Sequence, residues 1–162
     1  MHELNDFSHT CCFLGHRTIC ETDELRTQLY NTIEMLIENY GVTTFLFGSK
    51  SRFNSLCYEI TTEIKKKYSH IQRIYVRAEF PDIEEEYKKY LLGYYECTYF
   101  PNCARNSGKS VYIKRNREMI DKSEYCVFYY NKLLEPTNRN SGTKIAYKYA
   151  IKKKRKIYLL PL

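Results

Sequence analysis

Short apolar runs recur along this chain of 162 residues, separated by longer stretches of mixed polarity. Five runs of four to six residues are rich in aromatic and β-branched side chains: residues 11–14, 43–47, 73–77, 125–130 and 156–160. Their apolarity is continuous rather than alternating, which is typical of strands in a sheet that helices cover on both faces. Three runs end at turn-forming residues, namely Gly15, Gly48 and Asn131. We therefore predict five buried strands.

Apolar residues between these runs recur at steps of three and four, which is the pattern of amphipathic helices. The clearest stripe spans residues 25–40, with Thr22 suited to its start and Gly41 to its exit. Four further helices are predicted over residues 56–64, 83–91, 111–122 and 145–150. Tyr40 and Tyr90 belong to these stripes, so we expect them to point inward.

Strands and helices alternate along the whole chain, apart from two irregular stretches at residues 96–109 and 131–141. Such alternation predicts an α/β fold in which right-handed crossovers place helices on both faces of a mainly parallel, doubly wound sheet. We expect a three-layer, Rossmann-like sandwich with a sheet of about five strands. The length fits one domain over residues 1–162, with a flexible stretch at residues 1–10.

Composition narrows the class of protein. The chain is 43% hydrophobic and 28% charged, which is ordinary for a globular protein. No apolar stretch approaches the ~18–20 residues of a membrane span, and the N-terminus lacks the layout of a signal peptide. We therefore expect a cytoplasmic protein with no membrane partner. Its 7 cysteines are expected to be free and mostly buried, and their spacing does not indicate a metal site.

A net charge of +7 first suggests a nucleic-acid partner. The lysine clusters at residues 65–67 and 152–156 follow two helical stripes, however, where cations complement the helix dipole by about 0.3–1 kcal/mol. We expect those helix ends to lie away from any ligand site. The 17 tyrosines fall mostly on strands and apolar stripes, which predicts that they belong mainly to the core.

Ligands of open parallel sheets bind beyond the carboxyl ends of the strands. After the first strand, Gly15 allows a ligand to approach the backbone closely, and Arg17 offers a planar donor for phosphate. The alternative is a glycine that ends a strand, followed by the solvated side chains of His16 and Arg17. Arg115 and Asn116, near the start of the fourth helix, are candidates at the same edge or part of a solvated basic face.

Two further segments, at residues 48–54 and 138–143, place glycine and hydroxyl groups just before a helix. Free amides and the helix dipole make such a position an anion site, although Ser49, Ser51 or Asn54 can also serve as an ordinary N-cap. The candidate ligand-binding residues are Gly15, His16, Arg17, Gly48, Ser49, Lys50, Arg52, Arg115, Asn116, Ser141, Gly142 and Thr143. Together they favour a small ligand that carries phosphate.

These segments resemble the SLOG superfamily, in its YpsA-like branch. The matching sequences are Phe-Leu-Gly-His-Arg at residues 13–17, Gly-Ser at 48–49, Arg-Asn-Arg-Glu-Met-Ile-Asp-Lys-Ser at 115–123 and Ser-Gly-Thr-Lys-Ile-Ala at 141–146. The resemblance covers residues 11–160. The superfamily is Rossmann-like and includes DNA-processing protein A and the LONELY GUY phosphoribohydrolases. The resemblance implies binding of a nucleotide or of a nucleotide-derived molecule related to NAD or ADP-ribose.

The chain departs from the LONELY GUY motifs Glu-Arg-Lys-x-x-Met and Gly-Gly-x-Gly-Thr-x-x-Glu. Residues 114–119 keep Arg115 and Met119 but lack the glutamate and the lysine, and Ala146 stands where the second motif has its acid. Cleavage of a glycosidic bond needs a nearby carboxylate. The comparison therefore argues against this hydrolase activity and leaves the phosphate-binding parts in place.

Three hypotheses follow. The first is a binding module or sensor for a nucleotide, with no cofactor implied beyond that nucleotide. The second is a nucleotide hydrolase that uses Glu79, Asp82 or Glu118 instead of the missing acids. The third is a DNA-binding protein, which the position of the lysines ranks last. A homo-oligomer is plausible for the superfamily, and candidate contact residues are Tyr94, Tyr95, Tyr99 and Phe100, which can equally pack under the long loop.

Overall fold

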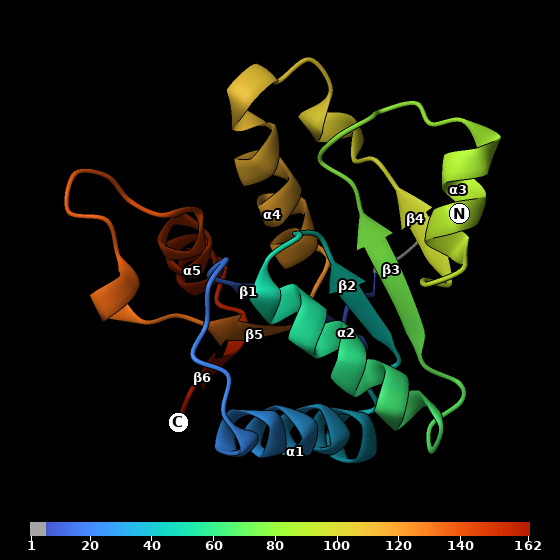
Figure 1. Ribbon diagram of the computed structural model, residues 1–162, viewed down its shortest axis with the longest axis vertical. Helices are drawn as coiled ribbons and strands as arrows, with labels where there is room; N and C mark the ends of the chain where they lie inside the picture. The colour runs from blue at the N-terminus through green and yellow to red at the C-terminus, as the bar shows by residue number, and fades with distance from the viewer. Residues whose placement is uncertain (1–5) are drawn as a thin grey trace.

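The computed structural model describes residues 6–162, in which six strands and five α-helices alternate (Figure 1). The strands are β1 (Thr10–Gly15), β2 (Thr44–Phe47), β3 (Gln72–Val76), β4 (Cys97–Tyr99), β5 (Tyr125–Tyr129) and β6 (Lys156–Leu160). The α-helices are α1 (Asp23–Tyr40), α2 (Arg52–Lys65), α3 (Glu85–Leu92), α4 (Val111–Asp121) and α5 (Gly142–Lys152). Short 3-10 turns lie at Asn102–Ala104, Gly108–Ser110 and Lys132–Leu134.

The strands form one sheet in the order β4-β3-β2-β1-β5-β6, and every neighbouring pair is parallel. After β1, the chain adds β2, β3 and β4 in turn on one side of it. The chain then returns to add β5 and β6 on the other side. Right-handed crossovers therefore place the helices before β5 and β6 on the face opposite α1 and α2. The predicted three-layer, doubly wound α/β fold is confirmed.

The number of strands is six rather than five. The additional strand, β4, lies in the stretch at residues 96–109 that we expected to be irregular. It has three residues, occupies one edge of the sheet and is exposed or half-buried along its length. A strand that is covered so little needs no continuous apolar run, so the sequence pattern does not reveal it.

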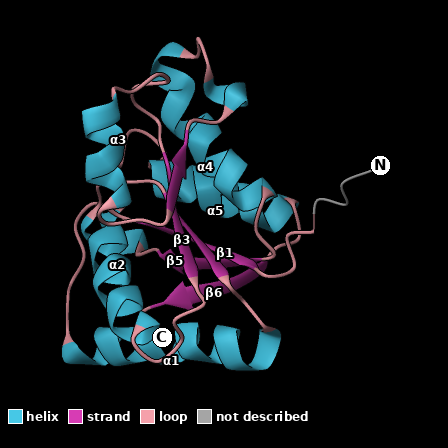
Figure 2. Cartoon of the chain, turned by 90° about the vertical axis from the view of Figure 1, so that its right-hand side faces the viewer, coloured by secondary structure: helices cyan, strands magenta, loops and turns pink. Residues whose placement is uncertain are grey.

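The two faces of the sheet carry separate cores. Phe13, Phe45 and Val127 pack against α1 and α2, whereas Cys12 and Phe128 pack against α4 and α5. Figure 2 shows the strands between these two layers of helices. Because successive residues of a strand point to opposite faces, a strand covered on both sides must be apolar at every position. This explains the continuous apolarity of the runs.

Part of the N-terminal segment makes backbone hydrogen bonds to the sheet. Residues 1–5 of the expected flexible stretch lie outside the described residues. Thr10 already belongs to β1, and its amide donates to the carbonyl of Phe7 at 3.1 Å. The amide of Glu124 donates to the same carbonyl at 3.1 Å, which ties this segment to the strand β5. Backbone hydrogen bonds therefore hold residues 7–10 beside β5, and the flexibility of this stretch stays a prediction.

Most tyrosines pack in or against the core, as expected, but at its rim rather than at its centre. Of 17 tyrosines, Tyr125 and Tyr129 are buried, and the others are half-buried or exposed. Tyr40 and Tyr90 are 47% and 59% exposed, which corrects the expectation that they point inward. A phenol retains a hydroxyl that needs water or a partner, so tyrosine suits the rim of a core rather than its centre.

The four residues proposed as contacts between copies of the chain also differ in how deeply they are buried. The Tyr95 ring packs 5.2 Å from that of Tyr75 and 5.6 Å from that of Phe47, and the hydroxyl of Tyr99 is buried, so both belong to the packing of this chain. Tyr94 is 47% exposed. Phe100 is half-buried beneath the guanidinium of Arg105, at 5.9 Å.

The cysteines are all free thiols, and four of the seven are buried: Cys11, Cys12, Cys57 and Cys126. Burial raises the pKa of the Cys11 and Cys57 thiols well above its usual value, so they stay protonated and unreactive.

Within the described chain, no helix is long and apolar enough to span a membrane.

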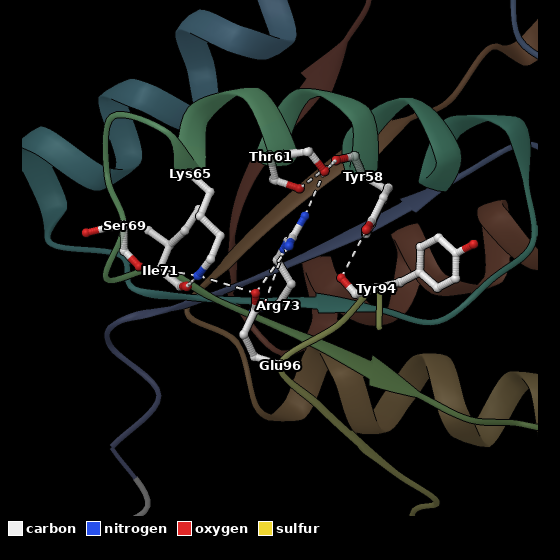
Figure 3. A network of polar contacts seen from close by, with 9 residues as sticks. Tyr58, Thr61, Lys65, Ser69, Ile71, Arg73, Tyr94 and Glu96 are labelled. Carbon is white, nitrogen blue, oxygen red and sulfur yellow. Dashed lines mark hydrogen bonds and ion pairs between the residues drawn. The ribbon is translucent and has the colours of Figure 1, made fainter. Parts of the chain in front are cut away.

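A buried arginine joins β3 to the segment before β4 (Figure 3). The Arg73 side chain is 8% exposed, and its Nε and Nη2 donate to the Glu96 carboxylate at 3.3 and 3.2 Å. Its Nη1 donates to Thr62 at 2.7 Å, and its guanidinium lies 4.9 Å from the centre of the Tyr58 ring. Lys65 adds a second cation 3.3 Å from Glu96. The buried charge is thus fully paired.

The Arg73–Glu96 pair is expected to contribute measurably to stability. Arg73→Met removes this partner but leaves Lys65 beside the half-buried carboxylate, so we expect the free energy of unfolding to fall by about 2 kcal/mol, less than the loss of about 3–5 kcal/mol for a buried charge left without any partner. Arg26→Met, which breaks an exposed pair with Glu21, is the control and should cost under about 1 kcal/mol. Urea denaturation measures both, and equal losses would contradict the assignment.

Candidate functional site

A cleft of about 880 Å³ opens beyond the carboxyl ends of β1, β2 and β3, beside the starts of α4 and α5. It lies where the strand order reverses, which is the usual ligand position in open α/β sheets. Eleven of the twelve candidate ligand-binding residues line it: Gly15, His16, Arg17, Gly48, Ser49, Lys50, Arg115, Asn116, Ser141, Gly142 and Thr143. The topology thus brings together four segments that are distant in sequence.

Arg52, the twelfth candidate, lies outside the cleft. It is the first residue of α2, and its guanidinium pairs with Glu21 at 2.6 Å and with Glu59 at 3.2 Å. Both carboxylates lie toward α1 and the flank of α2 rather than the sheet edge. The sequence placed Arg52 in the correct segment, but the helical backbone turns its side chain away.

The three candidate acids also differ in whether they line the cleft. Glu79 lines the cleft, where its carboxylate accepts from the Tyr112 hydroxyl at 2.8 Å and lies 3.7 Å from Lys50. Glu118 lies outside it, 2.9 Å from Lys122. Asp82 is also outside and is 90% exposed. Of the three acids, only Glu79 is in a position to meet a ligand.

Nearby side chains accept hydrogen bonds from backbone amides of the turn after β2. The Asn54 side chain is buried and accepts from the amides of Gly48 and Ser49 at 3.2 and 3.5 Å, while its nitrogen donates to Phe13 in β1 at 3.3 Å. Ser51 is the N-cap of α2 and accepts from the amide of Asn54 at 3.1 Å. The N-cap alternative is therefore the one the structure shows, and this turn shapes the cleft through side chains.

The start of α5 leaves donors free. Ser141 is the N-cap and accepts from the amide of Lys144 at 3.1 Å, and its own amide and hydroxyl donate to Glu135 at 2.6 and 2.8 Å. The amides of Gly142 and Thr143 have no acceptor among residues 6–162 and border the cleft. Unpaired amides in the first turn of a helix favour an anion.

Arg115 forms the floor of the cleft. Its side chain is 5% exposed, its Nη1 donates to the carbonyl of Gly48, and its Nε donates to Asn116 at 2.9 Å. A Cβ on Gly48 would lie 2.5 Å from the Met119 sulfur and 2.7 Å from Arg115 Cδ. Only glycine leaves room for this arginine, which explains the Gly-Ser turn in the sequence.

Arg115 makes no ion pair with the described residues, although the Glu79 carboxylate lies in the same cleft. Burial lowers the pKa of Arg115 to about 10, although Tyr75, Tyr112 and Glu79 oppose the shift. The guanidinium therefore remains protonated at neutral pH. Arg73, by contrast, is buried against a carboxylate. A buried cation without a partner is costly, and here it borders an open cleft.

His16 joins the loop after β1 to the loop after β5. It is 8% exposed, its Nε2 accepts from the amide of Asn131 at 3.1 Å, and its ring stacks 5.5 Å from that of Tyr130. The proton of the neutral ring is therefore on Nδ1. Burial lowers the pKa of His16 despite the nearby Glu135, so the ring is neutral at pH 7. It can donate one hydrogen bond to a ligand.

The structure adds cleft residues that were not among the candidates, chiefly Tyr75, Tyr112, Leu134 and Arg139. Tyr112 precedes Arg115 by three positions, and helical spacing alone places both on one face. Arg139 lies in the segment before α5 that the sequence had already indicated. With Arg17, Lys50, Arg115 and Arg139 against Glu79, cations predominate in the lining.

Comparison with known proteins gives no family for this chain. A scan against protein-family models found no match, and a search of curated proteins found none either.

Two glycines of the cleft test this geometry. Gly48→Ala forces a Cβ against Met119 and Arg115, so we expect it to lower the free energy of unfolding by about 1–3 kcal/mol. Gly142→Ala is the control, because a Cβ there meets no atom within 4 Å, and it should change stability by less than about 0.5 kcal/mol. Thermal and urea unfolding compare the two. Wild-type stability of Gly48→Ala would show that Arg115 does not need the glycine.

Proposed function

We propose that the cleft binds a nucleotide or a nucleotide-derived molecule through its phosphate groups. The observation that carries this proposal is Arg115, a buried, protonated arginine that borders the cleft and has no carboxylate partner in the described chain. A phosphate supplies the missing negative charge and accepts bidentate hydrogen bonds from a guanidinium. The resemblance of residues 11–160 to the SLOG superfamily supports the same ligand class.

The phosphate position follows from the donors around the cleft. Arg17 and Lys50 lie on the loops after β1 and β2 and add exposed positive charge to the cleft that Arg115 borders. The free amides of Gly142 and Thr143 add donors from the start of α5. Hydrogen-bond donors therefore lie on both sides of the cleft. Such an arrangement suits a ligand that presents more than one phosphate oxygen, as a nucleoside phosphate does.

The remaining lining suits the less polar part of such a ligand. Tyr75, Tyr112, Leu134 and Pro136 contribute aromatic and aliphatic surface, and Tyr112 is 47% exposed. Exposed aromatic rings stack on nucleobases without regard to sequence. We assign the base to this less polar part of the lining.

Binding without chemistry is the first hypothesis for the site. The residue at the position of the second motif acid, Ala146, is 2% exposed and packs against the sheet. No carboxylate projects from that position of α5, so the acid that the LONELY GUY enzymes use has no counterpart there. We therefore propose a binding module or sensor.

Isothermal titration calorimetry with AMP, ADP, ADP-ribose, NAD and inorganic phosphate tests the proposal. We expect at least one nucleotide to bind, and Arg17→Ala to weaken it about 10- to 100-fold through loss of one charge-assisted contact. Arg52→Ala removes the same charge outside the cleft and should change affinity less than about twofold. Binding of no ligand, or equal weakening by both variants, would overturn the proposal.

A nucleotide hydrolase is the second candidate, and one observation favours it. Glu79 lines the cleft, with its carboxylate next to Tyr112 and Lys50. The carboxylate can serve as a base or as an electrostatic partner for a sugar cation.

Chromatography after long incubation with AMP or NAD separates the two candidates. For a binding module we expect both compounds to remain intact with the wild-type protein. Release of the base by the wild type and by Glu118→Gln, but not by Glu79→Gln, would establish the hydrolase instead. Glu118 is a suitable control because it lies outside the cleft.

A further inference from the structure

The positive charge of the chain is concentrated in its C-terminal third. Residues 105–162 contain 15 Lys and Arg and 4 Asp and Glu, whereas residues 1–104 contain 11 Lys and Arg and 15 Asp and Glu. The topology converts this division along the sequence into a division in space. Helices α4 and α5 pack on one face of the sheet, and α1 and α2 pack on the other (Figure 1). The helical layer formed by α4 and α5 is therefore strongly basic.

The lysines of the two layers also differ in their ion pairs. Each of the three lysines at residues 65–67, at the end of α2, has its Nζ within 3.3 Å of a carboxylate oxygen. On α5, by contrast, Lys144, Lys148 and Lys152 form no ion pair with the part of the chain that the structure describes. The surplus charge is thus neutralised on the α2 side and left available on α5.

The free lysines of α5 form a row. They are four residues apart, so Lys144, Lys148 and Lys152 extend over about 12 Å along one side of the helix. Ala146 and Ala150 lie on the opposite side and are buried against the sheet. The row therefore lies on the outer side of the helix and not only at its C-terminal end; Lys148 and Lys152 are exposed, and Lys144 is half-buried.

The basic surface continues from α5 onto α4. The exposed Arg117 guanidinium lies 5.1 Å from the centre of the Tyr149 ring, and Lys153 lies 5.5 Å from the same ring. The Tyr149 hydroxyl donates to Asp121 at 2.7 Å, which fixes the ring between the two helices. Cations and an aromatic ring are thus interleaved on one surface.

We propose that this surface, the α4–α5 face, binds the phosphodiester backbone of a nucleic acid. Its members are Lys114, Arg117, Lys144, Lys148, Lys152 and Lys154. A row of unpaired cations neutralises successive phosphates and releases their counter-ions, which gives affinity that depends on salt and not on sequence. The face is separate from the proposed nucleotide cleft, because none of these residues lines that cleft.

An anionic membrane offers similar charge, but the apolar content of the surface favours nucleic acid. Membrane-surface helices bury several Trp, Phe or Leu side chains in the interface. In the described α4 and α5, Tyr112 and Ile151 are the exposed large hydrophobic residues, and Tyr112 belongs to the cleft. One isoleucine is too little apolar surface for insertion.

Fluorescence anisotropy tests the proposal with labelled oligonucleotides of about 30 residues, single- and double-stranded, at about 50 mM salt. The variant K144Q/K148Q/K152Q removes the row. Its matched control, K66Q/K88Q/K89Q, removes the same three charges from exposed positions on α2 and α3. We expect the row variant to bind at least about tenfold more weakly and to lower the salt slope by about 2, and the control to change affinity less than about twofold.

Three outcomes would overturn the proposal: no binding by the wild type at low salt, equal weakening by the two variants, or tighter binding to phosphatidylserine vesicles than to either oligonucleotide. Calorimetry of the row variant with the nucleotide that binds the wild type keeps the two sites apart. Unchanged nucleotide affinity shows that the row variant is folded, and it separates a failure of the α4–α5 face from a failure of the cleft.

Discussion

The contact between Arg115 and the carbonyl of Gly48 joins the two halves of this fold. It ties α4, which precedes β5, to the turn after β2 on the other side of β1, and it is possible because Gly48 has no Cβ. The same contact leaves a protonated guanidinium at the floor of the cleft with no carboxylate partner in the described chain. A structural constraint and a binding property therefore depend on the same side chain.

Two of the three buried arginines, Arg73 and Arg115, show how similar side chains acquire different roles. Arg73 is held by Glu96, Thr62 and the Tyr58 ring, so its charge is satisfied within the fold. Arg115 donates its hydrogen bonds only to neutral acceptors. Since the desolvation of a charge is costly unless it is paired, the first arrangement serves stability and the second favours an external anion. This difference is the physical basis for placing a phosphate at the cleft.

The sheet also organises charge at longer range. The loops at its carboxyl edge gather Arg17, Lys50 and Arg139 around the cleft, while the layer of α4 and α5 carries a row of lysines. The net charge of the whole chain hides this arrangement, because residues 1–104, with 11 Lys and Arg against 15 Asp and Glu, are acidic, and residues 105–162, with 15 against 4, are strongly basic. Composition alone first suggests one polyanion site. The structure distributes the positive charge between the lining of a small cleft and an extended surface.

Continuous apolarity and helical spacing were enough to predict five strands, five helices and their parallel, doubly wound arrangement. They also placed eleven of twelve candidates at one edge, because the carboxyl ends of parallel strands must meet there. What the sequence could not supply was the direction of individual side chains. The Arg52 side chain points toward Glu21, and the Asn54 side chain accepts hydrogen bonds from the amides of the turn after β2. The sequence pattern did not reveal β4, because an edge strand needs no continuous apolar run. Local pattern determined the elements and the edge where they end. Only tertiary packing decided which charges are paired, because pairing depends on neighbours that are far apart in the chain.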